Sequence, residues 1–272
     1  MVCWLNKIKK IILLSTLSLQ TLGSSGVTES FVIGSLGDSI TTATNARGWG
    51  DQKNSNWSTG TENLDKVKSH YHKLKNFFGE DIKAVNVARA GSTSEDLSNQ
   101  VTKLISFNPD YVTLLIGAND VCSWHDDHHL QLQRFKNRIH NSVNRLIEHN
   151  SEVKILLVPV PDMYHLWRLG SKSSCQFLWD MANVCPRLLH SSTPSHKKIE
   201  FKKRLDDLNK SLFQVANDHS DHVRFDFSLA EYKFKKEDVS RSDCFHPSFK
   251  GQNTISELTW QASSDGSQRR SF

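Results

Sequence analysis

Five short runs of apolar, largely β-branched residues recur along the chain, and longer polar segments separate them. The runs cover residues 31–34, 83–87, 111–116, 153–158 and 222–227. Each run is short and continuously apolar, which is typical of a strand buried on both faces of a sheet. We therefore interpret all five as buried strands.

Most of the segments between these runs carry apolar residues at intervals of three and four, which predicts amphipathic helices. The predicted helices cover residues 63–78, 95–107, 130–150 and 197–218, and a last one extends from about 247 to 260. Strands that alternate with helices favour a parallel sheet because the helical crossovers cover both of its faces. The pattern therefore predicts an α/β fold.

Residues 159–194 interrupt this alternation, because they are rich in Trp, Cys and Ser and show no clean period. We interpret them as an insertion over one rim of the sheet. The polar residues 263–272 are expected to form a flexible tail. A single domain would then occupy residues 26–262.

The first 25 residues carry lysines, then an apolar stretch at 11–19, and then small residues. This is the layout of a secretory signal peptide, and the apolar stretch is too short for an ordinary membrane-spanning helix. A merely amphipathic or disordered N-terminus is the alternative. The interpretation predicts a secreted, periplasmic or extracellular protein.

Composition and charge narrow the classes of partner. The chain has 272 residues, of which 37% are hydrophobic and 23% charged, as in an ordinary soluble domain. Lys and Arg number 34 against 29 Asp and Glu, and the excess is scattered rather than gathered into a basic stripe. We therefore expect a monomer that does not bind nucleic acid, while transient contact with an anionic membrane surface stays open.

Removal of a signal peptide would remove Cys3 and leave Cys122, Cys175, Cys185 and Cys244. An even number of cysteines is typical of a chain that meets an oxidising compartment. Cys175 and Cys185 are close in sequence, so the favoured pairs are Cys175 with Cys185 and Cys122 with Cys244. Four free thiols are the alternative.

Candidate chemistry lies at the carboxyl ends of the predicted strands, where the active sites of open parallel sheets collect. Ser39 follows the first strand within Gly37-Asp38-Ser39, and this turn lacks the lysine of a phosphate-binding loop and the second glycine of a G-x-S-x-G turn. Asp243 and His246 follow the last strand at a spacing that can place both side chains on one side of a turn.

Together these residues could perform acyl transfer. A serine nucleophile needs a base within reach, and the base needs an acceptor that orients it. The tetrahedral intermediate needs hydrogen-bond donors, and the candidates are the main-chain N–H groups of Ser39 and Gly91 and the amide of Asn119. Each of these residues alone would be an ordinary turn or capping residue.

The ordered blocks Gly37-Asp38-Ser39, Gly91, Gly117-Ala118-Asn119-Asp120 and Asp243-Cys244-Phe245-His246 resemble the GDSL, or SGNH, hydrolase family. The resemblance implies that Ser39 is the nucleophile, His246 the base and Asp243 its partner. It also implies that Ser39, Gly91 and Asn119 form the oxyanion hole. The implied fold is a three-layer α/β/α sandwich with a five-stranded parallel sheet, of flavodoxin-like type.

No metal or cofactor is implied. The histidine-rich segment 125–129 is expected to be a solvated loop, because the sequence offers no matching cluster of metal ligands elsewhere. Asn56-Trp57-Ser58 and Asn209-Lys210-Ser211 fit the pattern for N-linked glycosylation.

A narrower likeness involves "NWSTG" at 56–60, "LIGANDVC" at 115–122 and "DCFHPSFKGQ" at 243–252, which look like the phospholipase B-like branch. Ala118 and Thr61 stand where that branch commonly has other residues, and these departures bear only on the substrate. The resemblance implies a secreted serine esterase acting on phospholipids or lysophospholipids. The alternatives are a carbohydrate acetylesterase or other small-ester hydrolase, and a non-catalytic secreted lipid- or glycan-binding protein.

Overall fold

A computed structural model describes residues 30–62, 66–79, 81–124 and 127–264. The predicted signal peptide lies outside the described residues, as do residues 265–272 of the predicted tail. The last helix continues through Ser264, two residues into the segment predicted as a tail.

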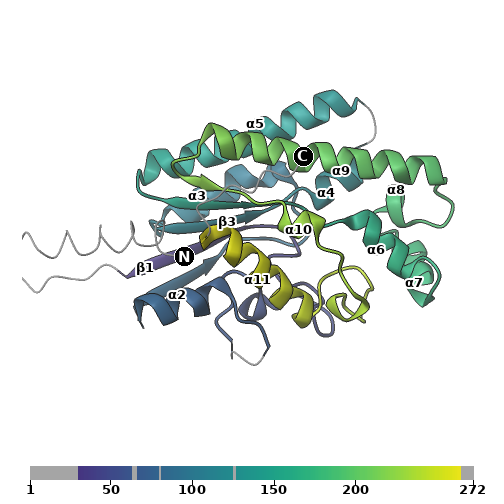
Figure 1. Cartoon of the computed structure of the whole chain (residues 1–272), viewed down its shortest axis with the longest axis horizontal. Helices are drawn as coiled ribbons and strands as arrows, with labels where there is room; N and C mark the ends of the chain where they lie inside the picture. The colour runs from purple at the N-terminus through teal and green to yellow at the C-terminus, as the bar shows by residue number, and fades with distance from the viewer. Residues whose placement is uncertain (1–29, 63–65, 80, 125–126, 265–272) are drawn as a thin grey trace, which may run out of the picture.

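Five parallel strands form one sheet in the order β2-β1-β3-β4-β5 (Figure 1). They are β1 (Phe31–Gly37), β2 (Ile82–Asn86), β3 (Tyr111–Leu115), β4 (Lys154–Val158) and β5 (Val223–Arg224). All neighbouring strands pair in parallel, as the sequence pattern predicts. The last strand lies at the edge of the sheet and is shorter than the predicted 222–227, because only two of its residues pair with its neighbour β4.

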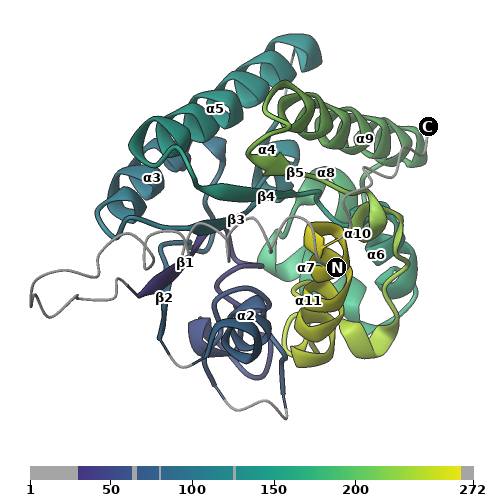
Figure 2. The same cartoon turned by 60° about the vertical axis from the view of Figure 1, so that its left-hand side comes forward.

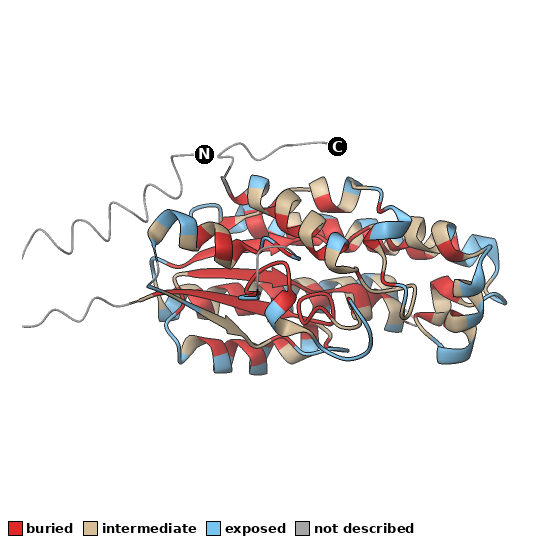
Figure 3. Ribbon diagram, turned by 90° about the horizontal axis from the view of Figure 1, so that it is seen from below, coloured by how far each residue is buried: buried red, intermediate tan, exposed pale blue. Residues whose placement is uncertain are grey.

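Helices cover both faces of the sheet, so the predicted three-layer sandwich is confirmed (Figures 1 and 2). One face carries α3 (Leu97–Ile105), α5 (His128–His149) and α9 (Ser195–Asp218). The other face carries α2 (His70–Phe78) and α11 (Phe249–Ser264). Two separate clusters of buried apolar side chains fill the two interfaces, and the central strands β1, β3 and β4 between them are buried along their whole length (Figure 3).

Helix α2 begins at His70 rather than near residue 63, because Ser69 caps it. The Ser69 hydroxyl accepts the N–H of His72 and donates to the carbonyl of Gly60. This second bond ties the start of the helix to the preceding turn, whose Asn56 carboxamide oxygen accepts the N–H groups of Ser58 and Thr59.

Both asparagines that fit the glycosylation pattern are buried. Asn56 is fully buried within its turn. The carboxamide of Asn209 accepts the N–H of Val160 at 2.8 Å and donates to the Val160 carbonyl at 2.9 Å. In the folded protein these side chains are structural and inaccessible to a glycan.

The segment without a clean period forms three short helices at the carboxyl edge of the sheet (Figure 1). They are α6 (Met163–Gly170), α7 (Ser174–Ala182) and α8 (Pro186–Leu189). Helices of four to nine residues span fewer than three turns, so they leave little periodic signal. We call residues 163–189 the helical insertion.

The predicted disulfide pairing is wrong. The observed bonds join Cys122 to Cys185 and Cys175 to Cys244. Cys175 lies in the first turn of α7 and Cys185 lies beyond its last turn, so helix geometry separates them by roughly 15 Å. A disulfide requires Cα atoms within about 7 Å, which excludes the favoured pair.

The remaining short elements lie in the connections between these layers. They are α4 (Ala118–Ser123), α10 (Ser228–Glu231), η1 (Lys53–Ser55), η2 (Ser94–Asp96) and η3 (Lys236–Asp238). Across the described parts of the chain, no helix combines the length and apolar character needed to cross a bilayer.

Candidate active site

Ser39 lies in a tight turn directly after β1. The turn is closed by the carbonyl of Asp38, which accepts the N–H groups of Thr41 and Thr42, each at 3.1 Å. Gly37 precedes it with φ of +149°, and a Cβ atom there would lie 2.4 Å from the carbonyl oxygen of Leu115. Only glycine permits this close approach of β1 to β3. The turn that follows therefore places Ser39 at the carboxyl edge of the sheet.

Gln100 of α3 fixes the end of β1. Its carboxamide accepts the N–H of Gly37 at 2.8 Å and donates to the Gly37 carbonyl at 2.9 Å. The same nitrogen donates to the hydroxyl of Ser92 at 3.2 Å, beside Gly91. A single buried side chain therefore connects the turn that carries Ser39 to the loop that carries Gly91.

His246 and Asp243 form a hydrogen-bonded pair. Nδ1 of His246 donates to Oδ2 of Asp243 at 2.6 Å, and Asn45 donates to the same oxygen at 2.8 Å. Burial alone would raise the pKa of Asp243, but the hydrogen bonds from His246, Asn45 and the N–H of Phe245 hold the pKa below its usual range. Asp243 is therefore a carboxylate near neutral pH, and Nε2 of His246 is left as a proton acceptor.

Asn119 lies in the first turn of α4, just beyond the carboxyl end of β3, and its side chain reaches the Gly91 loop. Its Nδ2 donates to the carbonyl of Ser92 at 2.9 Å. Gly91 has φ of +79°, a left-handed conformation that favours glycine. Within the described chain, the main-chain N–H groups of Ser39 and Gly91 donate to no other group.

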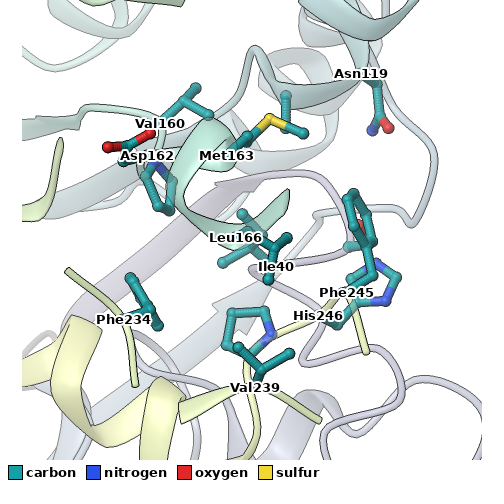
Figure 4. Close-up of a pocket in the computed structure, with 14 residues that line it drawn as sticks. Ile40, Asn119, Val160, Asp162, Met163, Leu166, Phe234, Val239, Phe245 and His246 are labelled. Atoms are coloured by element: carbon teal, nitrogen blue, oxygen red, sulfur yellow. The ribbon is translucent and has the colours of Figure 1, made fainter. Parts of the chain in front are cut away.

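Ser39, Asn119 and His246 line one pocket at the carboxyl edge of the sheet. The pocket is a cleft that opens to solvent. Figure 4 shows Asn119, Phe245 and His246 along one side of it. The rest of the wall is mainly apolar and includes Ile40, Val160, Met163, Leu166, Phe234 and Val239.

Of the sequence-predicted residues, Ser39, Asn119 and His246 line the pocket, and Asp243 joins it through its hydrogen bond with His246. The Ser39 hydroxyl and the His246 imidazole face the same pocket without a hydrogen bond between them. Such bonds are often long in unliganded enzymes and shorten when substrate binds. Gly91 is not part of the pocket wall itself and joins the site through Ser92 and Asn119.

Asp38 is fully buried behind the turn. Its Oδ1 accepts the N–H of Ile40 at 2.9 Å, while Oδ2 has no hydrogen-bond partner among the described residues. Burial raises the pKa of Asp38 to about 7, and the hydrogen bond from the N–H of Ile40 offsets part of that effect.

The part of the chain that the structure describes contains no group of three or more His, Cys, Asp or Glu side chains that could hold a metal ion. Of the histidine-rich segment, His125 and Asp126 lie outside the described residues, and Nε2 of His128 contacts Asp207 Oδ2 at 3.1 Å.

Sequence analysis missed three positioning residues. Asn45 and Gln100 were not singled out, and neither was Gln252, which donates to the carbonyl of Ile40 and accepts the N–H of Trp57. Each is an amide far in sequence from its partner, so no local spacing reveals it. Only the fold brings them to the site.

A parallel α/β sheet whose carboxyl edge joins a serine, a histidine–aspartate pair and an asparagine amide on one pocket defines the class of serine ester hydrolases. The profile of the family described as GDSL-like Lipase/Acylhydrolase matches residues 33–259, and the chain belongs to that family. The family resemblance stated from the motifs is therefore confirmed.

Individual relatives agree with this assignment. The chain is 26% identical over 274 residues to "Phospholipase B1, membrane-associated" of Homo sapiens, and the alignment covers 84% of this chain but 18% of the relative. Phospholipase A1 from Streptomyces albidoflavus NA297 superposes with a TM-score of 0.55 at 13% identity, over 86% of this chain and 100% of that chain. The lipase/acylhydrolase from Enterococcus faecalis gives a TM-score of 0.53 at 19% identity, over 88% and 99%. At these identities the two structures show a shared fold.

Proposed function

We propose that the protein hydrolyses acyl esters of phospholipids or lysophospholipids through an acyl-enzyme on Ser39. The observation that carries this proposal is the convergence of Ser39, Asn119 and the hydrogen-bonded pair His246–Asp243 on one apolar pocket.

The first step forms the acyl-enzyme. Nε2 of His246 takes the proton of the Ser39 hydroxyl as Oγ bonds to the ester carbonyl carbon. The imidazolium, stabilised by Asp243, then gives this proton to the leaving alcohol as the ester C–O bond breaks. In the second step His246 takes a proton from water, the hydroxide attacks the acyl carbon, and the fatty acid leaves as the proton returns to Ser39.

Three donors would stabilise the negative oxygen of both tetrahedral intermediates. The N–H groups of Ser39 and Gly91 are not used elsewhere in the described chain. Asn119 uses one of its two amide hydrogens on Ser92 and keeps the other. Donors that are held in place before the reaction need no reorganisation when charge develops, which is why they lower the barrier.

The pocket favours a long apolar acyl group. Leu166, Phe234 and Val239 extend the wall away from the side that carries Asn119 and His246 (Figure 4). An acyl chain whose carbonyl lay at Ser39 could bury its methylenes there, at about 0.8 kcal/mol for each CH₂. The names of two relatives, phospholipase B1 and phospholipase A1, support the same class of substrate.

Export is part of the proposal. Two disulfides in a chain whose first residues have the layout of a signal peptide suit an oxidising compartment outside the cytosol. Mass spectrometry of the exported protein should find a mature N-terminus near residue 26 and both disulfides. An uncleaved chain with free thiols would contradict export.

Release of p-nitrophenol from a short-chain ester, compared with Ser39→Ala, tests the reaction itself. The wild-type protein should turn the ester over and Ser39→Ala should not. A panel of phosphatidylcholine, lysophosphatidylcholine and acetylated xylan then tests the substrate class. Equal rates with and without Ser39 would contradict the mechanism, and exclusive deacetylation of xylan would contradict the lipid substrate.

A further inference from the structure

Most large apolar side chains in the described chain are buried, but a few are strongly exposed. Three of these lie beside the turn that carries Asp243 and His246: Trp49, Phe177 and Met181 are 78%, 69% and 68% exposed. A soluble monomer gains nothing from placing such side chains together in water, and clusters of them mark interaction surfaces.

Trp49 is held beside the catalytic turn by its own loop. The N–H of Gly48 donates to the hydroxyl of Ser242 at 3.1 Å, and the hydroxyl of Ser240 donates to the carbonyl of Asn45. Trp49 therefore directly follows Gly48, which contacts the segment that leads into Asp243.

Phe177 and Met181 are held beside the same turn by a covalent bond. They lie one helical turn apart on α7, so they share a face, while Trp179 between them points to the opposite side and is fully buried. The disulfide from Cys175, at the start of this helix, joins Cys244 between Asp243 and His246. Figure 1 shows α7 at the carboxyl edge of the sheet.

Exposed cations accompany these apolar side chains. Arg47 and Arg241 lie in the two segments around Trp49, and Arg168 and Lys172 precede α7. None of the four pairs with a carboxylate within the described residues. The acid nearest to Trp49 in sequence, Asp51, directs Oδ1 to the hydroxyls of Thr42 and Thr44. Besides Asp243, which pairs with His246, these segments carry the carboxylates of Asp51 and Asp180, so the four cations leave a net positive charge.

We propose that Trp49, Phe177 and Met181, together with Arg47, Arg168, Lys172 and Arg241, form a docking surface for an aggregated lipid surface that carries anionic headgroups. Exposed aromatic and apolar side chains enter the boundary between headgroups and acyl chains, and cations beside them add about fivefold in affinity each. Docking there presses the pocket mouth against the lipid surface. The inference rests on the proposed lipid substrate, because the docking surface would bind the lipid aggregate that contains this substrate.

Vesicle binding by a hydrolytically silent protein tests the surface. Ser39→Ala protein is mixed with vesicles of phosphatidylcholine plus phosphatidylglycerol, or of phosphatidylcholine alone, and the bound fraction is measured by sedimentation. The triple variant Trp49→Ser, Phe177→Ser, Met181→Ser should bind the mixed vesicles roughly tenfold or more weakly. Arg47→Gln with Arg241→Gln should weaken binding to mixed vesicles and leave the weaker binding to phosphatidylcholine unchanged.

Phe107→Ser is the matched control for Phe177→Ser. Phe107 is also exposed, at 38%, but it precedes β3 at the opposite edge of the sheet. Its replacement should leave vesicle binding within about twofold of the parent. Thermal unfolding of every variant shows that it is folded.

The outcomes separate this inference from the proposed function. Equal vesicle binding by the triple variant and the Phe107→Ser control, or no binding by the parent, would overturn the docking surface. So would concentration-dependent self-association that the triple variant abolishes, which would assign the surface to a second copy of the chain. The proposed function fails separately, if protein with Ser39 intact binds vesicles but hydrolyses neither their lipids nor a soluble ester.

Discussion

The amide of Asn119 donates a 2.9 Å hydrogen bond to the carbonyl of Ser92, the residue that follows Gly91. Asn119 and Gly91 come from loops after different strands, so this bond joins two candidate oxyanion donors into one unit. The same bond fixes the orientation of the amide and leaves its second hydrogen available to substrate.

Asn119→Ala should therefore lower kcat by about 10²–10³, equivalent to some 3–4 kcal/mol, and leave KM nearly unchanged. The reason is that the donor meets a charge that exists only in the transition state. Steady-state kinetics on one soluble ester measure both constants. A defect confined to KM would show that Asn119 only shapes the loop.

Asp243→Asn should lower kcat by about 10²–10⁴, because an amide cannot hold the imidazole in the tautomer that leaves Nε2 unprotonated. Asn45→Ala is the matched comparison, since it removes one hydrogen bond from Asp243 and keeps the carboxylate. We expect that variant to lose no more than about tenfold. Similar losses in both variants would mean that the charge of Asp243 is unimportant.

Asp38 should make the folded protein less stable as the pH rises. Its folded pKa of about 7 lies above its usual value of 3.8, so the folded state keeps a proton that the unfolded state releases between these values. The contribution of this group to stability falls through that window, and the loss is complete above pH 7.

Asp38→Asn removes this titration. The difference in the free energy of unfolding, variant minus wild type, should increase by about 2–3 kcal/mol when the pH is raised from 5 to 8. Denaturant unfolding at both pH values measures the gain, with the exposed Asp51→Asn as control. Parallel curves for wild type and Asp38→Asn would show that Asp38 does not titrate in this range.

Loss of the Cys175–Cys244 disulfide should reduce kcat by about tenfold, because Cys244 lies between Asp243 and His246 and its restraint narrows the positions that both residues adopt. The comparison is Cys175→Ser with Cys244→Ser against Cys122→Ser with Cys185→Ser. The two bridges close segments of similar sequence separation, 69 and 63 residues, so each pair should cost about 2–4 kcal/mol of stability. Equal kcat values in the two double variants would refute a specific role for Cys244.

The sheet was predictable because its central strands β1, β3 and β4 are buried on both faces and are therefore largely apolar, while the outer strands β2 and β5 keep shorter apolar runs. The positions of Ser39, Gly91 and Asn119 followed from it, since each comes soon after a strand and the carboxyl ends of parallel strands meet at one edge. His246 lies 22 residues beyond β5, after α10 and η3, so the fold and not a strand end brings it to the site. The position of Asn45 against Asp243 was not predictable, because 198 residues separate the two.

The disulfides were mispredicted for a related reason. Closeness in sequence favoured Cys175 with Cys185, but the intervening helix α7 left no periodic signal that would have separated them. The two tripeptides that fit the glycosylation pattern also misled, because a tripeptide carries no information about burial and both asparagines are buried.

The observed disulfides overlap along the chain, since Cys175 lies between Cys122 and Cys185, and Cys185 lies between Cys175 and Cys244. Any single peptide-bond cleavage between Cys122 and Cys244 therefore leaves the two fragments covalently joined, and a cut between Cys175 and Cys185 leaves them joined twice. The helical insertion that walls the pocket can be nicked by a protease without being released, and Asn119 and His246, on opposite sides of the cut, stay on one molecule.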